Sequence, residues 1–213
     1  DRMCFQYTAF QLCCALKPYS LLHALAAGAQ RALYLDADML VTHPFLDVLT
    51  RRWEADLLVS PHLRRPEAET DYTTFLRAGF LNAGFLGARA GAGSRRLLSW
   101  WRDRLAYDCY RDYYGGVLED QRWLDMAAAL FGNTDRCTHT GINTAHWNLH
   151  ECDFREQDGT LYARPGEPLC LFHFSAFRHP GLTDHPMRSA AVPPAIERLC
   201  AQYADQLAAA RAV

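Results

Sequence analysis

The chain has 213 residues, of which 50% are hydrophobic and 22% are charged, and its formal net charge is -2 at pH 7. This balance is typical of a globular domain and excludes a disordered or fibrous chain. The small net charge gives no indication of a nucleic-acid-binding surface. No apolar run reaches the ~20 residues that a membrane-spanning helix needs. The printed sequence begins with an aspartate, so the lack of a signal peptide says nothing about targeting.

Eight cysteines raise the question of disulfide bonds. Cys13 and Cys14 are neighbours in an apolar helical stretch, and Cys170 and Cys200 lie within apolar patterns. A cysteine in such a place behaves as a small hydrophobic residue. The sequence also has no Asn-x-Ser/Thr acceptor for N-glycosylation. We therefore expect reduced cysteines and a cytoplasmic protein.

Hydrophobic periodicity predicts an alternation of helices and strands. Short continuous apolar runs indicate strands that are covered on both faces, as in a parallel sheet, whereas longer amphipathic stretches indicate helices. Proline and glycine mark helix starts and ends. In chain order, the predicted elements are helices over 8–16 and 18–27, a strand over 32–35, a short helix over 44–53, a strand over 55–60, a loop over 61–72, a strand over 80–86, helices over 94–107 and 118–131, short strands within 138–149 and 161–174, and a final helix over 194–212.

This order predicts an α/β fold with a mostly parallel central sheet flanked by helices. We expect residues 1–213 to form a single domain that lacks its first βα units. Only 35 residues precede Asp36, and they are predicted to be mainly helical, whereas each βαβ unit needs ~30 residues. In such sheets ligands bind beyond the carboxyl ends of the strands. Polar residues at strand ends are therefore the candidates for a functional site.

An acidic pair follows the first predicted strand. Asp36 and Asp38 are two residues apart, and alternate residues of an extended backbone point to the same side. Both carboxylates can therefore face one point, where their repulsion favours a bound cation. Oxygen ligands suit Mg²⁺ or Mn²⁺, which commonly complete their shells with substrate phosphates. The alternative is a solvated turn after a strand, and the pair alone does not decide between the two.

Three further blocks follow the acidic pair in a fixed order. They are Asn82-Ala83-Gly84 on a strand, Asp120-Gln121-Arg122-Trp123-Leu124-Asp125 at a helix start, and His173-Phe174-Ser175-Ala176-Phe177 after a strand. With Tyr34 to Val41, this ordered set resembles the GT-A glycosyltransferases, most of all the retaining family-8-like group that uses nucleotide-sugar donors. The blocks over 5–8, 13–18 and 143–150 also resemble a related bacterial glycosyltransferase group.

The resemblance implies a GT-A (nucleotide-diphospho-sugar transferase) fold and a role for each matching residue. Asp36 and Asp38 would bind Mn²⁺, or Mg²⁺, and the donor diphosphate, with His173 as a third metal ligand. Asp120 and Gln121 would be the catalytic residues that face the reacting sugar carbon. The other donor-binding residues would be Lys17, Asn82, Gly84 and Arg178.

The sequence departs from the family pattern in three places. Ala176 stands at a glycine position, and Arg178-His179-Pro180-Gly181 stands where the family has Lys-Pro-Trp. The diphosphate-binding lysine is therefore absent, and Arg178 is the candidate to replace it, since a guanidinium binds phosphate well. Asp125 stands where the family tends to have asparagine.

The resemblance implies hexosyl transfer from a nucleotide sugar to a glycan, lipid-linked or surface-polymer acceptor, with retention of the anomeric configuration. A divalent cation and a basic side chain stabilise the charge that develops on a nucleoside diphosphate leaving group. An inverting reaction would instead need a general base such as Asp120 or Asp125. Two alternatives are a metal-dependent phosphohydrolase or nucleotidyltransferase, and an inactive carbohydrate-binding remnant. No nucleic-acid partner is expected, and peripheral contact with a membrane stays open.

Other polar residues have simpler interpretations. The histidines and cysteines over 137–152 match no standard zinc spacing, and the segment 146–150 alternates as a strand does. Asn143 and Asn148 are interpreted equally as lining a sugar pocket or as hydrogen-bonding at a strand end. The two arginines at 64–65 are expected to be solvated charges of a loop, and the alternative is contact with an acceptor or a phosphate.

Overall fold

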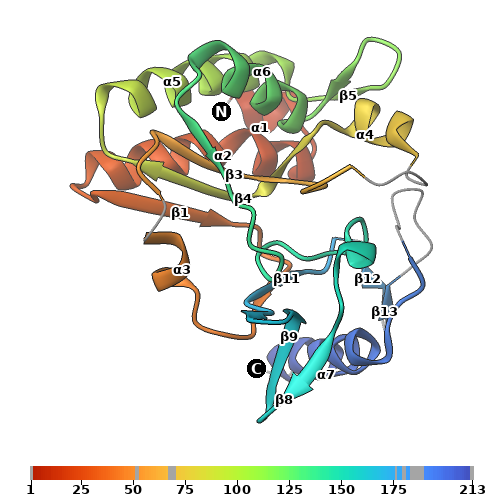
Figure 1. Ribbon diagram of the computed structural model, residues 1–213. Coiled ribbons are helices and arrows are strands. Elements are labelled where there is room, and N and C mark those ends of the chain that lie inside the picture. The colour runs from red at the N-terminus through yellow and green to blue at the C-terminus, as the bar shows by residue number, and fades with distance from the viewer. Residues whose placement is uncertain are drawn as a thin grey trace. The chain divides into compact units, whose positions relative to one another are not determined.

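The computed structural model describes residues 2–50, 53–66, 71–175, 177–178, 181–182 and 190–211. These residues form a mixed α/β structure (Figure 1), which confirms the predicted class. The chain divides into two compact units. Unit 1 comprises Asp1–Leu35, Leu49–His62 and Asp71–Cys137, and unit 2 comprises Asp36–Val48, Leu63–Thr70 and Thr138–Val213. The expectation of a single GT-A domain stays a prediction.

Unit 1 consists of a four-stranded sheet, a short hairpin and the helices around them. Helix α3 (Leu46–Thr50) spans the boundary with unit 2. In chain order, the elements of unit 1 are α1 (Arg2–Gln6), α2 (Ala9–Ala26), β1 (Arg31–Leu35), β3 (Leu57–Pro61), α4 (Tyr72–Ala78), β4 (Leu81–Arg89), α5 (Ala92–Asp108), β5 (Arg111–Asp112), β6 (Val117–Leu118), α6 (Gln121–Phe131) and β7 (Thr134–Arg136).

The sheet of unit 1 is mixed, so the expectation of a mostly parallel sheet is wrong here. Its strand order is β1-β4-β3-β7. Strand β4 runs antiparallel to both β1 and β3, and only β3 and β7 are parallel. Strand β4 is buried on both faces along nearly its whole length. Its continuous apolar run therefore reflected two-sided burial, which does not specify the direction of the neighbouring strands.

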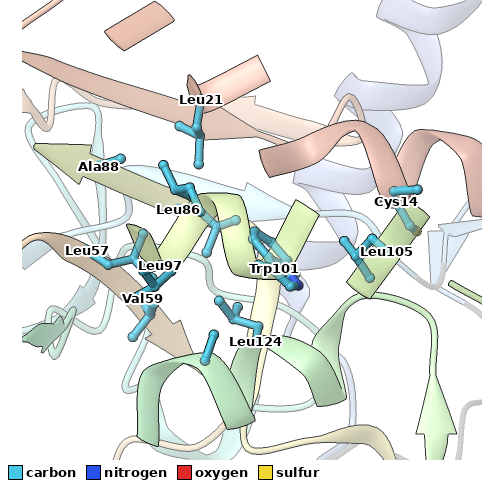
Figure 2. Packing of buried hydrophobic residues seen from close by; sticks show 14 of the residues in the cluster. Cys14, Leu21, Leu57, Val59, Leu86, Ala88, Leu97, Trp101, Leu105 and Leu124 are labelled. Atoms are coloured by element: carbon cyan, nitrogen blue, oxygen red, sulfur yellow. The ribbon is translucent and has the colours of Figure 1, made fainter. Parts of the chain in front are cut away.

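The main core of unit 1 lies between one face of this sheet and helices α2, α5 and α6 (Figure 1). Cross-strand pairs between β3 and β4, such as Leu57 with Ala88 and Val59 with Leu86, provide the sheet side of this core. Figure 2 shows the packing, with these labelled side chains: Cys14, Leu21, Leu57, Val59, Leu86, Ala88, Leu97, Trp101, Leu105 and Leu124. On the other face of β4, the indole of Trp53 lies against Gly87, where an added Cβ would be 2.7 Å from the ring.

Helix α2 is one helix, although two were predicted. It begins after Thr8, whose hydroxyl accepts a hydrogen bond from the Gln11 N–H while the Gln11 side chain accepts one from the Thr8 N–H. Pro18 lies in its interior rather than at a second start. Proline removes one helical hydrogen bond and crowds the preceding turn. Residues on both sides of Pro18, such as Cys14 and Leu21, are buried in the core, and this packing compensates for the loss.

Helix α6 begins at Gln121, three residues after the predicted start. Leu118 instead belongs to strand β6. Glu119 has a φ of 35°, in the left-handed region, and therefore cannot continue a right-handed helix. Asp120 occupies the N-cap position of α6.

Unit 2 contains short antiparallel pairs of strands and a long C-terminal helix. The strand orders are β10-β9-β8, β11-β2 and β12-β13. In chain order, the elements of unit 2 are β2 (Met39–Val41), a 3-10 helix η1 (Leu149–Glu151), β8 (Arg155–Gln157), β9 (Thr160–Arg164), β10 (Glu167–Pro168), β11 (Leu171–His173), β12 (Phe177–Arg178), β13 (Gly181–Leu182) and α7 (Pro194–Arg211).

Helix α7 begins at Pro194 as predicted, and Ala212 lies outside the described residues. Its residues Ile196, Leu199 and Cys200 are buried in the core of unit 2, and Tyr203 packs against this core and stacks on Phe174 with ring centroids 3.9 Å apart. The burial of Cys200 in this core raises the pKa of its thiol to about 11. No described helix is both long and apolar enough to cross a membrane.

The strands predicted within 138–149 are wrong. The described backbone there forms turns, with one isolated bridge between Thr144 and Phe172. Local hydrogen bonds replace a ladder, including those from Ile142 N–H to the His139 carbonyl and from Asn148 N–H to the Ala145 carbonyl. The alternating side chains of 146–150 therefore did not reflect an extended backbone.

Candidate metal centre and a second polar cluster

The three predicted metal ligands lie together in unit 2. One carboxylate oxygen each from Asp36 and Asp38 and one ring nitrogen of His173 are all within 4.8 Å of one another. His173 Nε2 lies 3.1 Å from Asp38 Oδ1. His173 is far from the two aspartates in the sequence, so the fold brings together the donors that the sequence predicted. We call them the Asp-Asp-His cluster.

The β2–β11 pair explains how the cluster forms. After Asp36 the chain turns, with a hydrogen bond from the Met39 N–H to the Asp36 carbonyl, and enters β2. In the antiparallel register His173 lies opposite Met39, next to Asp38. The Phe174 N–H donates to the Asp38 carbonyl at 2.8 Å. Backbone hydrogen bonds therefore hold the segments that carry Asp38 and His173 next to each other, independently of their side-chain contacts.

The donor set of the cluster suits a divalent cation. Two carboxylates close together repel each other, and a cation between them removes that repulsion. Carboxylate oxygens suit Mg²⁺ and Mn²⁺, whereas an imidazole ligand favours transition metals. The Asp38 side chain is 45% exposed and the His173 side chain 4%. The imidazole side of the cluster is thus closed by protein, and the carboxylate side is accessible to solvent and to a ligand.

The His173 ring has two more neighbours from the segment 138–149. Its Nδ1 is 3.0 Å from Oδ1 of Asn143. The indole of Trp147 meets the ring edge to face, with centroids 5.2 Å apart. Sequence reasoning left Asn143 open and gave Trp147 no role. Neither residue lies at a periodic spacing from His173, so only the folded chain reveals these contacts.

Arg178 lies in the short strand β12, which pairs with β13, and its side chain is exposed. Ala176, His179 and Pro180, where the sequence departs from the family pattern, lie outside the described residues.

A second polar cluster lies in unit 1. Nζ of Lys17 is 2.9 Å from Oδ2 of Asp120, and both side chains are almost fully buried. The ammonium also donates to the Ala83 carbonyl at 3.2 Å and lies 5.5 Å from the centre of the Tyr34 ring. The sequence predicted Lys17 to bind donor and Asp120 to act in catalysis. The structure pairs them with each other, which neither prediction included.

Asn82 and Gln121 are also joined in unit 1. Nδ2 of Asn82 donates to Oε1 of Gln121 at 2.9 Å, and Nε2 of Gln121 donates to the Ala78 carbonyl at 3.1 Å. The N–H of Gly84 donates to Oδ1 of Asn82 at 3.0 Å. The side-chain amides of both residues therefore hold β4, the end of α4 and the start of α6 together.

Sequence reasoning missed His62 in this network. Its Nε2 is 3.3 Å from Nδ2 of Asn82, and its Nδ1 is 3.0 Å from the Gly79 carbonyl. An amide nitrogen and a carbonyl oxygen at these positions are both satisfied when Nδ1 carries the proton and Nε2 accepts. In the sequence, the signal for His62 was its position shortly after the predicted strand 55–60.

The other carboxylates at the start of α6 have structural partners. Both oxygens of Asp125 accept backbone hydrogen bonds, from the Phe80 and Leu81 N–H groups at 2.9 and 2.8 Å. Burial raises the pKa of Asp125 despite these bonds. Burial likewise raises the pKa of Glu119, although Arg111 lies 2.8 Å away and opposes the shift. These contacts favour a structural role for Asp125 over that of a general base.

Arg64 is not the solvated loop charge that was predicted. It forms an ion pair of 3.0 Å with Glu151 in unit 2, and the two side chains are 6% and 1% exposed. The buried carboxylate of Glu151 needs a compensating cation, and it also accepts hydrogen bonds from the Arg64 and Arg65 N–H groups. Local sequence gave no sign of this distant partner.

No family model matches the chain. The chain is similar to two Bacillus subtilis (strain 168) proteins that are both described as uncharacterized. YfnF is 27% identical over 173 residues, which cover 79% of this chain and 57% of YfnF. YfnD is 26% identical over 178 residues, which cover 80% of this chain and 55% of YfnD. The chain thus spans somewhat more than half the length of these curated relatives.

Proposed function

We propose that this protein is a Mn²⁺-dependent glycosyltransferase of the GT-A fold, which transfers a hexose from a nucleotide sugar to a glycan, lipid-linked or surface-polymer acceptor. The observation that carries the proposal is the Asp-Asp-His cluster. The family resemblance of the sequence selected Asp36, Asp38 and His173 as metal ligands, and their donor atoms lie within 4.8 Å of one another.

The residues of the cluster have distinct parts in this proposal. Asp36 and Asp38 would hold the cation through oxygen, and His173 would hold it through nitrogen. A divalent cation bound there supplies positive charge that stabilises the nucleoside diphosphate as the glycosidic bond breaks. Because Asp38 is the exposed member of its pair with His173, the donor diphosphate would approach from the carboxylate side. Arg178, exposed in β12, is the proposed basic group for the diphosphate.

The unit 1 residues have supporting roles. Lys17 neutralises Asp120 inside the protein, and Gln121 fixes the amide of Asn82. Asp120 pairs with an ammonium, and Asp125 accepts two backbone hydrogen bonds. Neither carboxylate is therefore well suited to accept a proton as a general base. This arrangement supports the retaining reaction over the inverting one, which needs such a base.

Product analysis tests the proposal. The protein is incubated with a panel of nucleotide sugars and Mn²⁺, and the nucleotide product is identified by chromatography. Release of nucleoside diphosphate that requires Asp38 and His173 is the expected result. The matched control is Asp158→Asn, an exposed residue of unit 2 whose positive φ asparagine also adopts.

Two other outcomes would replace the proposal. Release of nucleoside monophosphate would indicate a phosphohydrolase or nucleotidyltransferase that uses the same carboxylates. Sugar binding without any product, undiminished in Asp38→Asn, would indicate a carbohydrate-binding remnant. If nucleoside diphosphate is released and a glycoside forms, proton NMR of that glycoside decides between retention and inversion.

A further inference from the structure

The His173 ring has an oxygen neighbour at each of its two nitrogens. Nε2 faces Oδ1 of Asp38 at 3.1 Å, inside the Asp-Asp-His cluster. Nδ1 faces Oδ1 of Asn143 at 3.0 Å, on the side away from the carboxylates. An amide oxygen can only accept a hydrogen bond, so this contact requires a proton on Nδ1. The Asp38 carboxylate at Nε2 also only accepts, so without a cation it competes with Asn143 for a ring proton. With a cation in the cluster, Nε2 would give its lone pair to the cation, and the one proton of the neutral ring would stay on Nδ1 beside Asn143.

Asn143 is fixed independently of the cluster. Its φ is 56°, in the left-handed region that asparagine adopts more readily than most residues, and it is fully buried. Its carbonyl accepts a hydrogen bond from Nδ2 of Asn148. The next residue, Thr144, donates its N–H to the Leu171 carbonyl and accepts the His173 N–H at 2.8 Å. The backbone thus attaches the Asn143 turn directly to strand β11.

Trp147 limits the rotation of the ring. Its indole meets the imidazole edge to face at 5.2 Å, with an interplanar angle of 86°. The imidazole side chain is only 4% exposed, so solvent does not replace the Asn143 oxygen if the ring turns. The ring therefore has one orientation in which Nε2 faces Asp38 and Nδ1 faces Asn143.

We propose that Asn143 is the positioning residue of the metal centre: its side-chain oxygen holds the proton of His173 on Nδ1 and keeps Nε2 directed at the cation site. The inference rests on the proposed metal-binding function of the cluster. Partners of this kind, which orient a histidine ligand from its second nitrogen, commonly change metal affinity by about 10–100-fold when removed.

Asn143→Gly is the informative substitution. Glycine adopts the positive φ of this position without strain, so the change removes the oxygen and retains the backbone. Asn143→Asp retains an acceptor oxygen at the same place. The matched control is Asp158→Gly, which makes a comparable change at an exposed left-handed position of the same unit.

Two readouts are needed. The first is ¹⁵N NMR of the protein with Zn²⁺, a diamagnetic probe that accepts imidazole nitrogen, with the His173 signals assigned by their loss in His173→Gln. With Zn²⁺ bound, the wild type and Asn143→Asp should carry the ring proton on Nδ1 and bind the ion through Nε2, whereas Asn143→Gly should show a mixture of the two tautomers. The second is Mn²⁺ affinity by electron paramagnetic resonance, which should fall about 10–100-fold in Asn143→Gly and be retained in Asn143→Asp and Asp158→Gly.

A double-mutant cycle separates positioning from a general structural effect. If Asn143 acts through His173, Asn143→Gly should have almost no further effect on Mn²⁺ affinity in a His173→Ala background. An equal loss in both backgrounds, or an unchanged tautomer and affinity in Asn143→Gly, would overturn the inference while the metal site stands. Failure of the wild type to bind Mn²⁺ would instead overturn the proposed function.

Discussion

The polar clusters of the two units differ in how their charges are balanced. In unit 1 the carboxylate of Asp120 lies against the ammonium of Lys17, both inside the protein. In unit 2 two carboxylates gather around one imidazole, and Asp38 is 45% exposed. Lys17 and Asp120 together carry no net charge, whereas the two carboxylates give the Asp-Asp-His cluster a negative net charge. The first arrangement stabilises its own fold, and the second is suited to a cation supplied from outside.

Lys17 is an example of a charge that is balanced inside the protein. It is the only lysine in a chain with 22 basic residues. Its site offers a carboxylate, a carbonyl and an aromatic face around one point. A compact ammonium donates in three directions, whereas a guanidinium is planar and larger. The geometry of this buried site therefore accounts for a lysine at this position.

Removal of the unit 1 cation should have the largest effect. Lys17→Met leaves Asp120 buried without its cation, which should lower the free energy of unfolding by about 3–5 kcal/mol. The double variant Lys17→Met/Asp120→Asn should recover most of this loss, since asparagine is neutral and also suits the N-cap position of α6. Urea denaturation monitored by circular dichroism measures both variants. A stability loss in the double variant as large as in the single one would show that the pair is not the cause.

Neutralisation of one carboxylate in the Asp-Asp-His cluster should weaken Mn²⁺ binding without lowering the stability of the metal-free protein. Asp38→Asn removes like-charge repulsion, so the metal-free protein should be as stable as the wild type or slightly more so. Its Mn²⁺ affinity should fall by at least the ~10–100-fold that follows loss of an outer partner of a ligand. Isothermal titration calorimetry and urea denaturation give the two values, with Asp158→Asn as control. Marked destabilisation of metal-free Asp38→Asn would contradict the distinction drawn between the two clusters.

The smallest expected effect concerns the buried thiol of α7 in unit 2. Burial raises the pKa of Cys200 from 9.0 to about 11. Between these values the unfolded chain loses a proton that the folded chain keeps, so stability is fully present below pH 9.0 and is lost as the pH rises toward 11. The contribution of one thiol to this slope is at most about 1.4 kcal/mol per pH unit.

Cys200→Ala tests this contribution through the free energy of unfolding at several alkaline pH values. The variant should lose stability less steeply with pH than the wild type, because one titrating group is gone. Cys4→Ala, which changes an exposed cysteine of α1, should have the wild-type slope. Parallel curves for wild type and Cys200→Ala would show that this thiol does not titrate differently in the folded state.

Local signals in the sequence predicted much of the fold. The starts of α2 and α7 follow from Thr8 and Pro194, and buried strands follow from short apolar runs such as that of β3. The direction of β4 did not follow, because an apolar run reports burial and not pairing. The uninterrupted course of α2 through Pro18 did not follow either, since it depends on packing against other elements.

The candidate site divides in the same way. The sequence by itself indicated the candidate ligands: Asp36 and Asp38 by their spacing after a predicted strand, and His173 by the resemblance to the glycosyltransferase blocks. Only the tertiary structure decided the contacts of Asn143 with His173, of Lys17 with Asp120 and of Arg64 with Glu151. Residue type and spacing carry information about nearby backbone, whereas the partner of a buried polar group depends on which distant segments the hydrophobic core brings together.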